Sequence, residues 1–245
     1  MSLTSIAVLG LSVTGSVGGL LVASVMLVLH ADIRARLVPW LVSYAVGTLL
    51  GAALLGLAPE ALAVLAPTPA LTALLAGIFT FFILEKLVLW RHCHDDESCA
   101  VHRTTVPLVI IGHTVHTFVD GIVIAAAALV SLTLGLTAAL AVAAHEVPQV
   151  AGDFAIVLAA GHSRRSALVL NLCAALGGVV GAGAMLLFGS RVPGVVPYVL
   201  AFAAGNFLYV AMADLIPSLH RGNIDRNSVR QIVLIGLGVL TVAAL

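Results

Sequence analysis

The chain has 245 residues, of which 61% are hydrophobic and only 9% are charged, and its formal net charge is zero. A soluble domain carries roughly 25% charged residues, so this composition excludes a fully water-facing surface and makes lipid the solvent for most of the chain. The neutral balance gives no indication of a nucleic-acid partner. We therefore expect an all-α, polytopic membrane protein in a lipid bilayer.

Apolar stretches recur along the whole chain. A spanning helix needs about 20 mostly apolar residues, and eight segments approach or meet this length: 4–29, 38–58, 70–90, 106–130, 133–160, 166–189, 195–217 and 230–245. The connections are short, so we expect one transmembrane domain over residues 1–245 with a polar loop at 91–105. The first span has no basic leader or small-residue cleavage site, which predicts a retained helix.

The basic residues predict how the spans are oriented. Ten of the eleven lie in or next to the connections after spans 1, 3, 5 and 7, and only Arg191 lies on the other side. The positive-inside rule makes the basic side cytoplasmic, so both termini are expected to be extracytoplasmic. The short chain, rich in Ala, Leu and Gly, suggests a bacterial inner (plasma) membrane.

Spans 2 and 7 resemble each other. Aligned without gaps, Gly47 meets Gly205 and Pro59 meets Pro217. The two spans are expected to run in opposite directions, so the alignment predicts an inverted repeat of helices 1–3 and 6–8 around a central pair of helices 4 and 5. Such repeats are common in secondary transporters. A chance likeness between two helices rich in Gly and Ala is the alternative.

Ionisable residues gather in the middle of spans 4 and 5. On span 4, His113, His116 and Asp120 share one helix face by their spacing of three and four. On span 5, His145, Gln149 and Asp153 share another face, and Glu146 lies beside that face. These span 5 residues complete the predicted cluster. With a rise of about 1.5 Å per residue, Asp120 and His145 lie roughly 18–20 Å into their spans.

A charge at that depth costs about 2.5–3.5 kcal/mol on insertion scales, so the cluster needs a compensating partner. Imidazole nitrogen with carboxylate or carbonyl oxygen suits zinc, iron or manganese. No thiolate joins the set, which is consistent with binding that is weak enough for release. The alternative is a buried network that only fixes helix packing. Pro148 frees the carbonyl of Ala144, either as a simple kink or to face an ion.

Weaker candidates flank this cluster. Asp214 in span 7 either touches the pathway or marks a helix end, and Glu60 at the outer end of span 2 either guides cations inward or is an ordinary interfacial residue. The loop between spans 3 and 4 offers a flexible metal-capturing segment through His92, Cys93, His94, Cys99 and His102. Its spacing matches no closed zinc site, so a merely solvated loop is the alternative.

At these residues the sequence resembles the ZIP (Zrt/Irt-like protein) family of divalent metal transporters. The strings that carry the resemblance are HTFVDG from His116, HEVPQVAGDFA from His145, and AGNFLYVAMADLIPSLH in span 7. The resemblance implies eight spans, outward termini and uptake of zinc, iron or manganese toward the cytoplasm. We expect zinc first, with cadmium as a further candidate ion. It also implies a primary metal site made of His116, Asp120, His145 and Gln149, with Glu146 near a secondary one.

The sequence departs from the family pattern at several positions. Thr117 replaces the usual Asn, His113 stands where Asp is common, and Gln149 with Val150 replaces His-Glu or similar residues. Gly178 lies about where some members have a Glu. The loss of carboxylates predicts one bound ion. We expect no cofactor beyond the transported metal. His113, Thr117 and Asp153 are candidate pathway or secondary-site residues.

Two other functions remain open at this point. His145 to Gln149 is one residue away from the HExxH motif of zinc metalloproteases, although Gln149 replaces the second His. An exporter would use the same site in reverse. Gly177 and Gly181 are spaced as GxxxG, which allows close helix approach or a homodimer contact. Our prediction is a transporter of divalent metal ions, not an enzyme.

Overall fold

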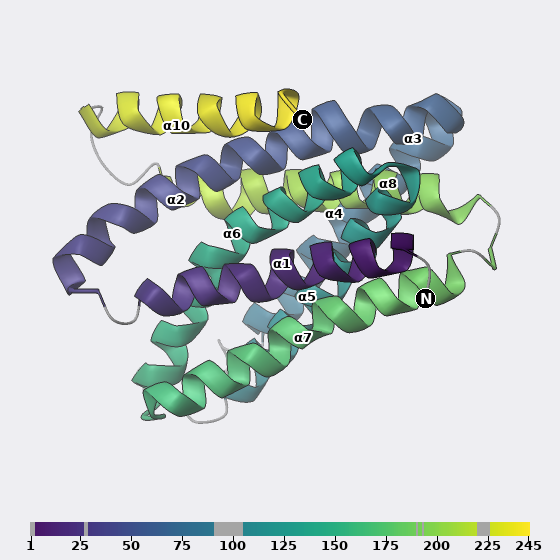
Figure 1. Ribbon diagram of the computed structural model, residues 1–245. Helices are drawn as coiled ribbons and strands as arrows, with labels where there is room; N and C mark the ends of the chain where they lie inside the picture. Colours follow the sequence, from purple (N-terminus) through teal and green to yellow (C-terminus); the bar gives the residue numbers. More distant parts are fainter. Residues whose placement is uncertain (1–2, 27–28, 91–104, 190, 193, 220–225) are drawn as a thin grey trace.

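The computed structural model describes residues 3–26, 29–90, 105–189, 191–192, 194–219 and 226–245. These residues form antiparallel helices and, in the described ranges, no strands (Figure 1). The helices are α1 (Leu3–Met26), α2 (Ala31–Gly51), α3 (Ala58–Val64), α4 (Pro67–Trp90), α5 (Thr105–Val130), α6 (Leu132–Ala159), α7 (Arg164–Phe188), α8 (Val195–Tyr209), α9 (Ile216–Leu219) and α10 (Arg226–Ala243). Seven described helical segments are long and apolar enough to span a membrane, and Ser228–Ala243 is a shorter apolar helix.

The eight predicted spans are therefore confirmed as helices, with shifts of a few residues at their ends. The second span is longer than predicted, because α2, a π-helical turn η1 (Ala52–Leu57) and α3 run on as one rod. The seventh has the same construction from α8, a π-helical turn η2 (Val210–Leu215) and α9. The membrane-spanning nature of the chain follows from these helices.

The two π-helical turns support the inverted repeat. The alignment that pairs Pro59 with Pro217 also pairs η1 with η2 residue by residue. In each turn the N–H just before the proline bonds five residues back, from Ala58 to Ala53 and from Ile216 to Ala211. A proline cannot donate to the i−4 carbonyl and clashes with it, so a wider turn before it relieves the same local conflict in both halves.

The packing follows the same symmetry. α2 packs along α10 as α8 packs along α4, and α1 packs along α6 as α7 packs along α5. A Cβ on Gly47 would overlap the carbonyl oxygen of Ile235, and a Cβ on Gly205 would overlap that of Leu74. Only glycine allows backbones to approach so closely, which explains why the aligned pair is glycine in both halves.

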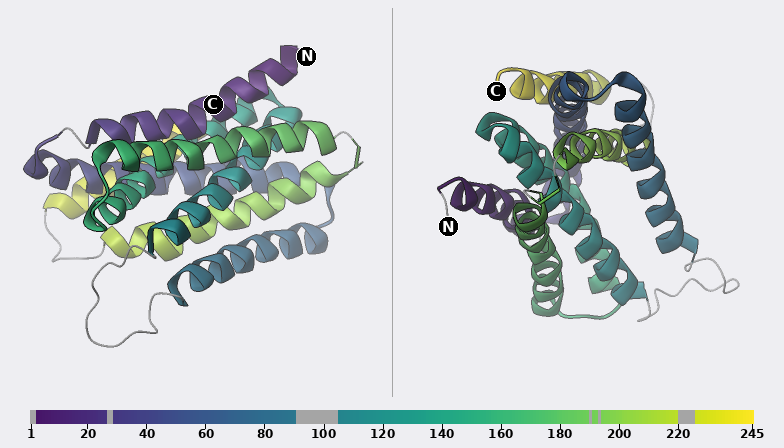
Figure 2. Two further views of the ribbon diagram at one scale, coloured as in Figure 1. Left: turned by 90° about the horizontal axis from the view of Figure 1, so that it is seen from below. Right: turned by 90° about the vertical axis from the view of Figure 1, so that its right-hand side faces the viewer.

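The helices fall into two groups. We call α1, α5, α6 and α7 the site bundle, and α2 to α4 with α8 to α10 the scaffold bundle; each packs mainly within itself. In the right-hand view of Figure 2 the scaffold helices lie in the upper and right part, and the site helices lie to the left and below. The contacts between the groups run chiefly through α2 with α6 and through α8 with α5.

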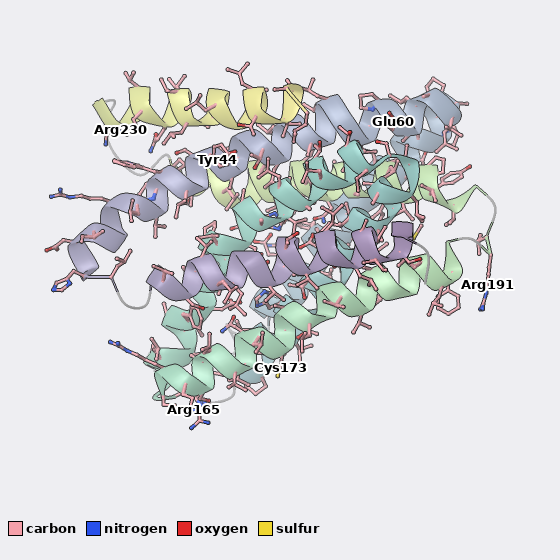
Figure 3. The ribbon with its side chains drawn as sticks, in the orientation of Figure 1. Tyr44, Glu60, Arg165, Cys173, Arg191 and Arg230 are labelled. Carbon is pink, nitrogen blue, oxygen red and sulfur yellow. The ribbon has the colours of Figure 1, made fainter. Side chains whose placement is uncertain are left out.

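The charged residues mark the two ends of the protein. Arg165 and Arg230 lie at one end, whereas Arg191 and Glu60 lie at the other (Figure 3). We call the first the basic end; α6 ends and α7 begins there. The first described residues of α1 and the end of α10 point toward the opposite end (Figure 1).

Candidate functional site

Three side chains from α5 and α6 converge in the site bundle. His116 Nε2 lies 3.1 Å from His145 Nε2, and Asp120 Oδ2 lies 3.4 Å from the first nitrogen and 3.5 Å from the second. We call these three residues the triangle. Among the described residues it is the group of His, Cys, Asp and Glu whose ligand atoms lie close enough together to hold one metal ion.

Asp120 and His145 have properties that metal-binding residues share. The side chain of Asp120 is fully buried, and neither of its oxygens has a hydrogen-bond partner within the described structure. A buried charged group without partners is costly. His145 Nδ1 lies 2.9 Å from the carbonyl oxygen of Ala141, which can only accept, so Nδ1 carries a proton. That contact orients the ring and leaves Nε2 as the nitrogen that could bind a metal ion.

The scaffold bundle contributes aromatic rings to the triangle. Phe81 of α4 meets the His116 ring edge-on, with centroids 5.4 Å apart, and Phe207 of α8 meets the His145 ring at 6.0 Å. The sequence analysis missed both residues, because a Phe in an apolar span carries no distinguishing signal. The rings cover the triangle with an apolar surface, which lowers the local dielectric and strengthens any electrostatic interaction with a cation.

Glu146 lies in a second group of ionisable residues. His113 Nε2 lies 2.8 Å from Glu146 Oε1, and His113 Nδ1 lies 2.8 Å from Asp153 Oδ2. The first contact is a hydrogen bond, while the angles of the second do not form one. We call these three residues the inner cluster. The family resemblance implied that Glu146 lies near a secondary metal site; in the structure its Oε1 faces His113.

The remaining predicted residues lie outside both groups. The Thr117 hydroxyl donates to the carbonyl oxygens of Ala174 on α7 and Thr114, at 2.7 and 3.1 Å, so it ties two helices together. Gln149 is half-buried one turn after His145, and no hydrogen bond of its side chain occurs in the described structure. Asp214 in η2 and Glu60 in α3 are exposed. The loop residues His92, Cys93, His94, Cys99 and His102 lie outside the described residues.

Asn206 on α8 is a polar residue that the sequence analysis did not single out. It is fully buried, and neither amide atom has a hydrogen-bond partner among the residues described. It directly precedes Phe207, which touches His145. Its signal in the sequence was a lone amide in the middle of span 7.

The two glycines of the GxxxG motif lie where α7 packs closely against α5. A Cβ on Gly181 would overlap the carbonyl oxygen of Phe118, and one on Gly177 would meet the Thr114 carbonyl oxygen at 2.7 Å. Both glycines are buried against α5. Of the two predicted uses of this motif, close helix approach is the one observed, and the homodimer stays a prediction.

The chain matches known proteins over the segment that holds the triangle. The family profile described as "ZIP Zinc transporter" matches residues 90–245, which include α5, α6 and the whole triangle. The chain belongs to the ZIP family. The ZIP family is a family of transporters, so the prediction that the chain is not an enzyme is confirmed.

Curated members of the ZIP family show the extent of the likeness. Zinc transporter ZIP13 of Pongo abelii is 35% identical over 215 residues, covering 82% of this chain and 64% of the relative. The Homo sapiens ZIP13 is 31% identical over 265 residues, covering 86% and 71%. Zinc transporter ZIP10 of Homo sapiens is 36% identical over 167 residues, covering 62% of this chain and 20% of the relative. The chain therefore spans roughly two thirds of these ZIP13 relatives and a smaller part of ZIP10. All three relatives are vertebrate proteins, so the bacterial inner membrane stays a prediction.

Proposed function

We propose that this chain is a secondary transporter that carries a divalent metal ion, zinc first, across the membrane through the triangle. One observation carries the proposal: a fully buried carboxylate without hydrogen-bond partners faces two imidazole nitrogens. Such a group needs a positive charge in hydrocarbon. The ZIP family names of the relatives supply zinc as the first cargo to test.

The dimensions of the triangle fit a tetrahedral zinc ion. Zn–N and Zn–O bonds of 2.0–2.1 Å place neighbouring ligand atoms about 3.3 Å apart, and the three observed separations are 3.1, 3.4 and 3.5 Å. Three ligands leave a fourth position open for water or another side chain, as in sites that exchange what they bind. Gln149, the neutral oxygen donor predicted from the sequence, is our candidate for that position once an ion is present.

The route of the ion follows the charge of the two ends. The basic end faces the cytoplasm by the positive-inside rule, so the opposite end, where Glu60 is exposed, faces outward. We propose uptake from the outer end to the triangle and then toward the basic end. Asp214 and the His- and Cys-containing loop at 91–105 would receive the ion there.

The packing favours a particular moving part. From the inverted repeat alone, one would expect the helices of both halves to shift against α5 and α6. Instead, α1 and α7 pack with α5 and α6 as the site bundle, so we propose that the four helices move together against the scaffold bundle. The rings of Phe81 and Phe207 that face the triangle make no hydrogen bond to it, so the site can slide past them without breaking a polar contact.

The structure disfavours the protease alternative, because Glu146 is not placed to act as its general base. In an HExxH enzyme the Glu activates a zinc-bound water, but here Glu146 is fully buried and pairs with His113. The second ligand of that motif would be Gln149, which is no imidazole. The exporter alternative uses the same triangle and differs only in direction, so the experiment must report direction.

Uptake of radioactive zinc into proteoliposomes tests the proposal. The expected result is zinc accumulation that requires Asp120 and His145 and proceeds from the outer end toward the basic end. Orientation is fixed by retaining only vesicles whose basic-end loop is protected from protease. Uptake that survives His145→Ala combined with Asp120→Ala contradicts the site, and accumulation only in the reverse orientation favours export.

A further inference from the structure

A pocket of about 700 Å³ lies at the basic end of the site bundle, where α6 turns back into α7. Its walls are apolar residues such as Ile110 and Ile111 on α5, Ala160 in the connection and Leu170 on α7, and His162 is the ionisable residue in its lining. Pockets that hold small molecules measure roughly 300–1,000 Å³. This pocket is therefore large enough for a ligand.

The pocket begins where the close contact of α5 with α7 ends. Farther from the basic end, Gly177 and Gly181 allow the backbone of α7 to approach that of α5. Nearer the basic end the two helices carry larger residues, Pro107 and Leu170, which line the pocket. Gly161 has a φ of +86° and makes the turn into α7, a conformation that glycine adopts readily.

The pocket opens on the outer surface of the bundle. Ile111 is 60% exposed, and Pro107 and Gly161 are exposed as well. The pocket is lined by or adjoins the spans Val106–Val130 and Leu132–Ala159, so its opening faces lipid. Because apolar walls give water no hydrogen-bond partners, such a cavity stays dry and takes up apolar molecules. A hydrocarbon chain suits it.

Positive charge borders the pocket. Arg164 and Arg165 begin α7 two and three residues after His162, both are exposed, and Arg165 lies at the basic end (Figure 3). The segments 105–119 and 154–189 contain no acidic residue, so they supply these arginines with no counter-ion. The N-terminus of α7 adds the positive end of a helix dipole, which favours a phosphate group.

We propose that this pocket binds an anionic phospholipid from the membrane leaflet at the basic end. One acyl chain enters the apolar pocket beside Ile110 and Leu170, and the phosphate lies against Arg164 and Arg165. Basic pockets between transmembrane helices bind anionic lipid head groups in this way. The apolar walls accept any acyl chain, and the arginines select the lipid that also carries a net negative charge. The proposal does not depend on which ion the chain transports.

Native mass spectrometry of the full chain tests the choice of lipid. The purified protein is titrated in detergent with dioleoyl phosphatidylglycerol, which is anionic, or dioleoyl phosphatidylcholine, which is zwitterionic. The wild type should retain one phosphatidylglycerol more tightly than phosphatidylcholine. Arg164→Gln with Arg165→Gln should weaken phosphatidylglycerol binding roughly fivefold for each arginine, the effect of one basic residue near a membrane surface.

The matched control removes two arginines from the scaffold bundle. Arg36 and Arg230 are exposed near the start of α2 and of α10, and these helices begin at the same end as α7 (Figure 1). Arg36→Gln with Arg230→Gln should leave phosphatidylglycerol binding unchanged. A wild type that binds both lipids equally overturns the proposal, as does a preference that survives without Arg164 and Arg165.

A second pair of variants tests the apolar pocket. Ala160→Phe fills the pocket and leaves the arginines in place, so it should lower the retention of both lipids. Ala159→Phe adds the same ring at an exposed position outside the lining and should not. Equal retention in the two variants contradicts the pocket as the site of the acyl chain.

A measurement on the wild type covers the case in which Ala160→Phe does not fold. Phosphatidylglycerol with a photoactivatable acyl chain is cross-linked to the full chain, and the labelled peptides are mapped. Labelling concentrated on residues 106–111 and 160–170 supports the proposal. Labelling spread evenly over the lipid-facing helices overturns it.

Discussion

The site bundle and the scaffold bundle use similar helices but differ in their buried polar groups. All of the buried ionisable residues in the described ranges belong to the site bundle, on α5 and α6. The scaffold bundle buries Ser43, Thr48 and Asn206, which are uncharged. The free-energy cost of burying charge is thus confined to the site bundle, and the scaffold bundle packs against it with uncharged side chains. This difference is what we expect if, as we propose, the site bundle binds the metal ion and the scaffold bundle guides it.

The largest effect is expected from removing the charge of the triangle. Asp120→Asn keeps the shape of the side chain but removes the charge, so zinc transport into proteoliposomes should fall by roughly 100-fold or more, since even outer-shell changes at metal sites cost 10–100-fold. Thr48→Val, a buried polar change in the scaffold bundle, is the matched control and should leave transport close to the wild-type rate. An equal loss of zinc transport in both variants would contradict the view that only the site bundle binds the ion.

Cross-linking the two bundles should come next in size. In a chain whose three cysteines are replaced by serine, Gly56→Cys with Thr137→Cys joins η1 to α6, since a Cβ on Gly56 lies 3.8 Å from Thr137 Cγ2. Thr137 Cγ2 occupies about the position that a cysteine sulfur would take, so the two side chains come within reach of each other. Oxidation should reduce zinc transport to background, and a reductant should restore it.

The matched cross-link lies within the scaffold bundle. Gly51→Cys with Val242→Cys joins α2 to α10, where the added Cβ would lie 3.1 Å from the Cβ of Val242. Oxidation of this pair should leave transport largely intact, because no movement between these helices is needed. Full transport with the first pair oxidised would show that the bundles do not move against each other.

Opposite stability changes are expected within the site bundle. In metal-free protein, Glu146→Gln weakens the buried hydrogen-bonded pair with His113 and should cost about 2 kcal/mol. Asp120→Asn instead removes a buried charge that accepts no hydrogen bond within the described residues, so it should leave stability unchanged or higher. Thermal unfolding in detergent with a chelator measures both. A lower melting temperature for Asp120→Asn than for Glu146→Gln would mean that Asp120, not Glu146, is the paired carboxylate.

Periodicity and charge predicted most of the fold, because each span must satisfy its own backbone hydrogen bonds in lipid. The paired glycines and prolines predicted the repeat, but not the π-helical turns, which depend on hydrogen bonds five residues apart. For the site, spacing brought His116, Asp120 and His145 to facing helices. It could not assign Glu146, since adjacent residues on a helix point in different directions and only the packing of α5 on α6 decides which one His113 meets.

X-ray absorption at the zinc edge tests the central claim most directly. With one equivalent of zinc bound to the full chain, we predict only nitrogen and oxygen neighbours at about 2.0–2.1 Å, including two imidazoles, and loss of one imidazole in His145→Ala. Sulfur neighbours at about 2.3 Å, or a spectrum unchanged in His145→Ala, would place the ion in the cysteine-containing loop and contradict the triangle as its site.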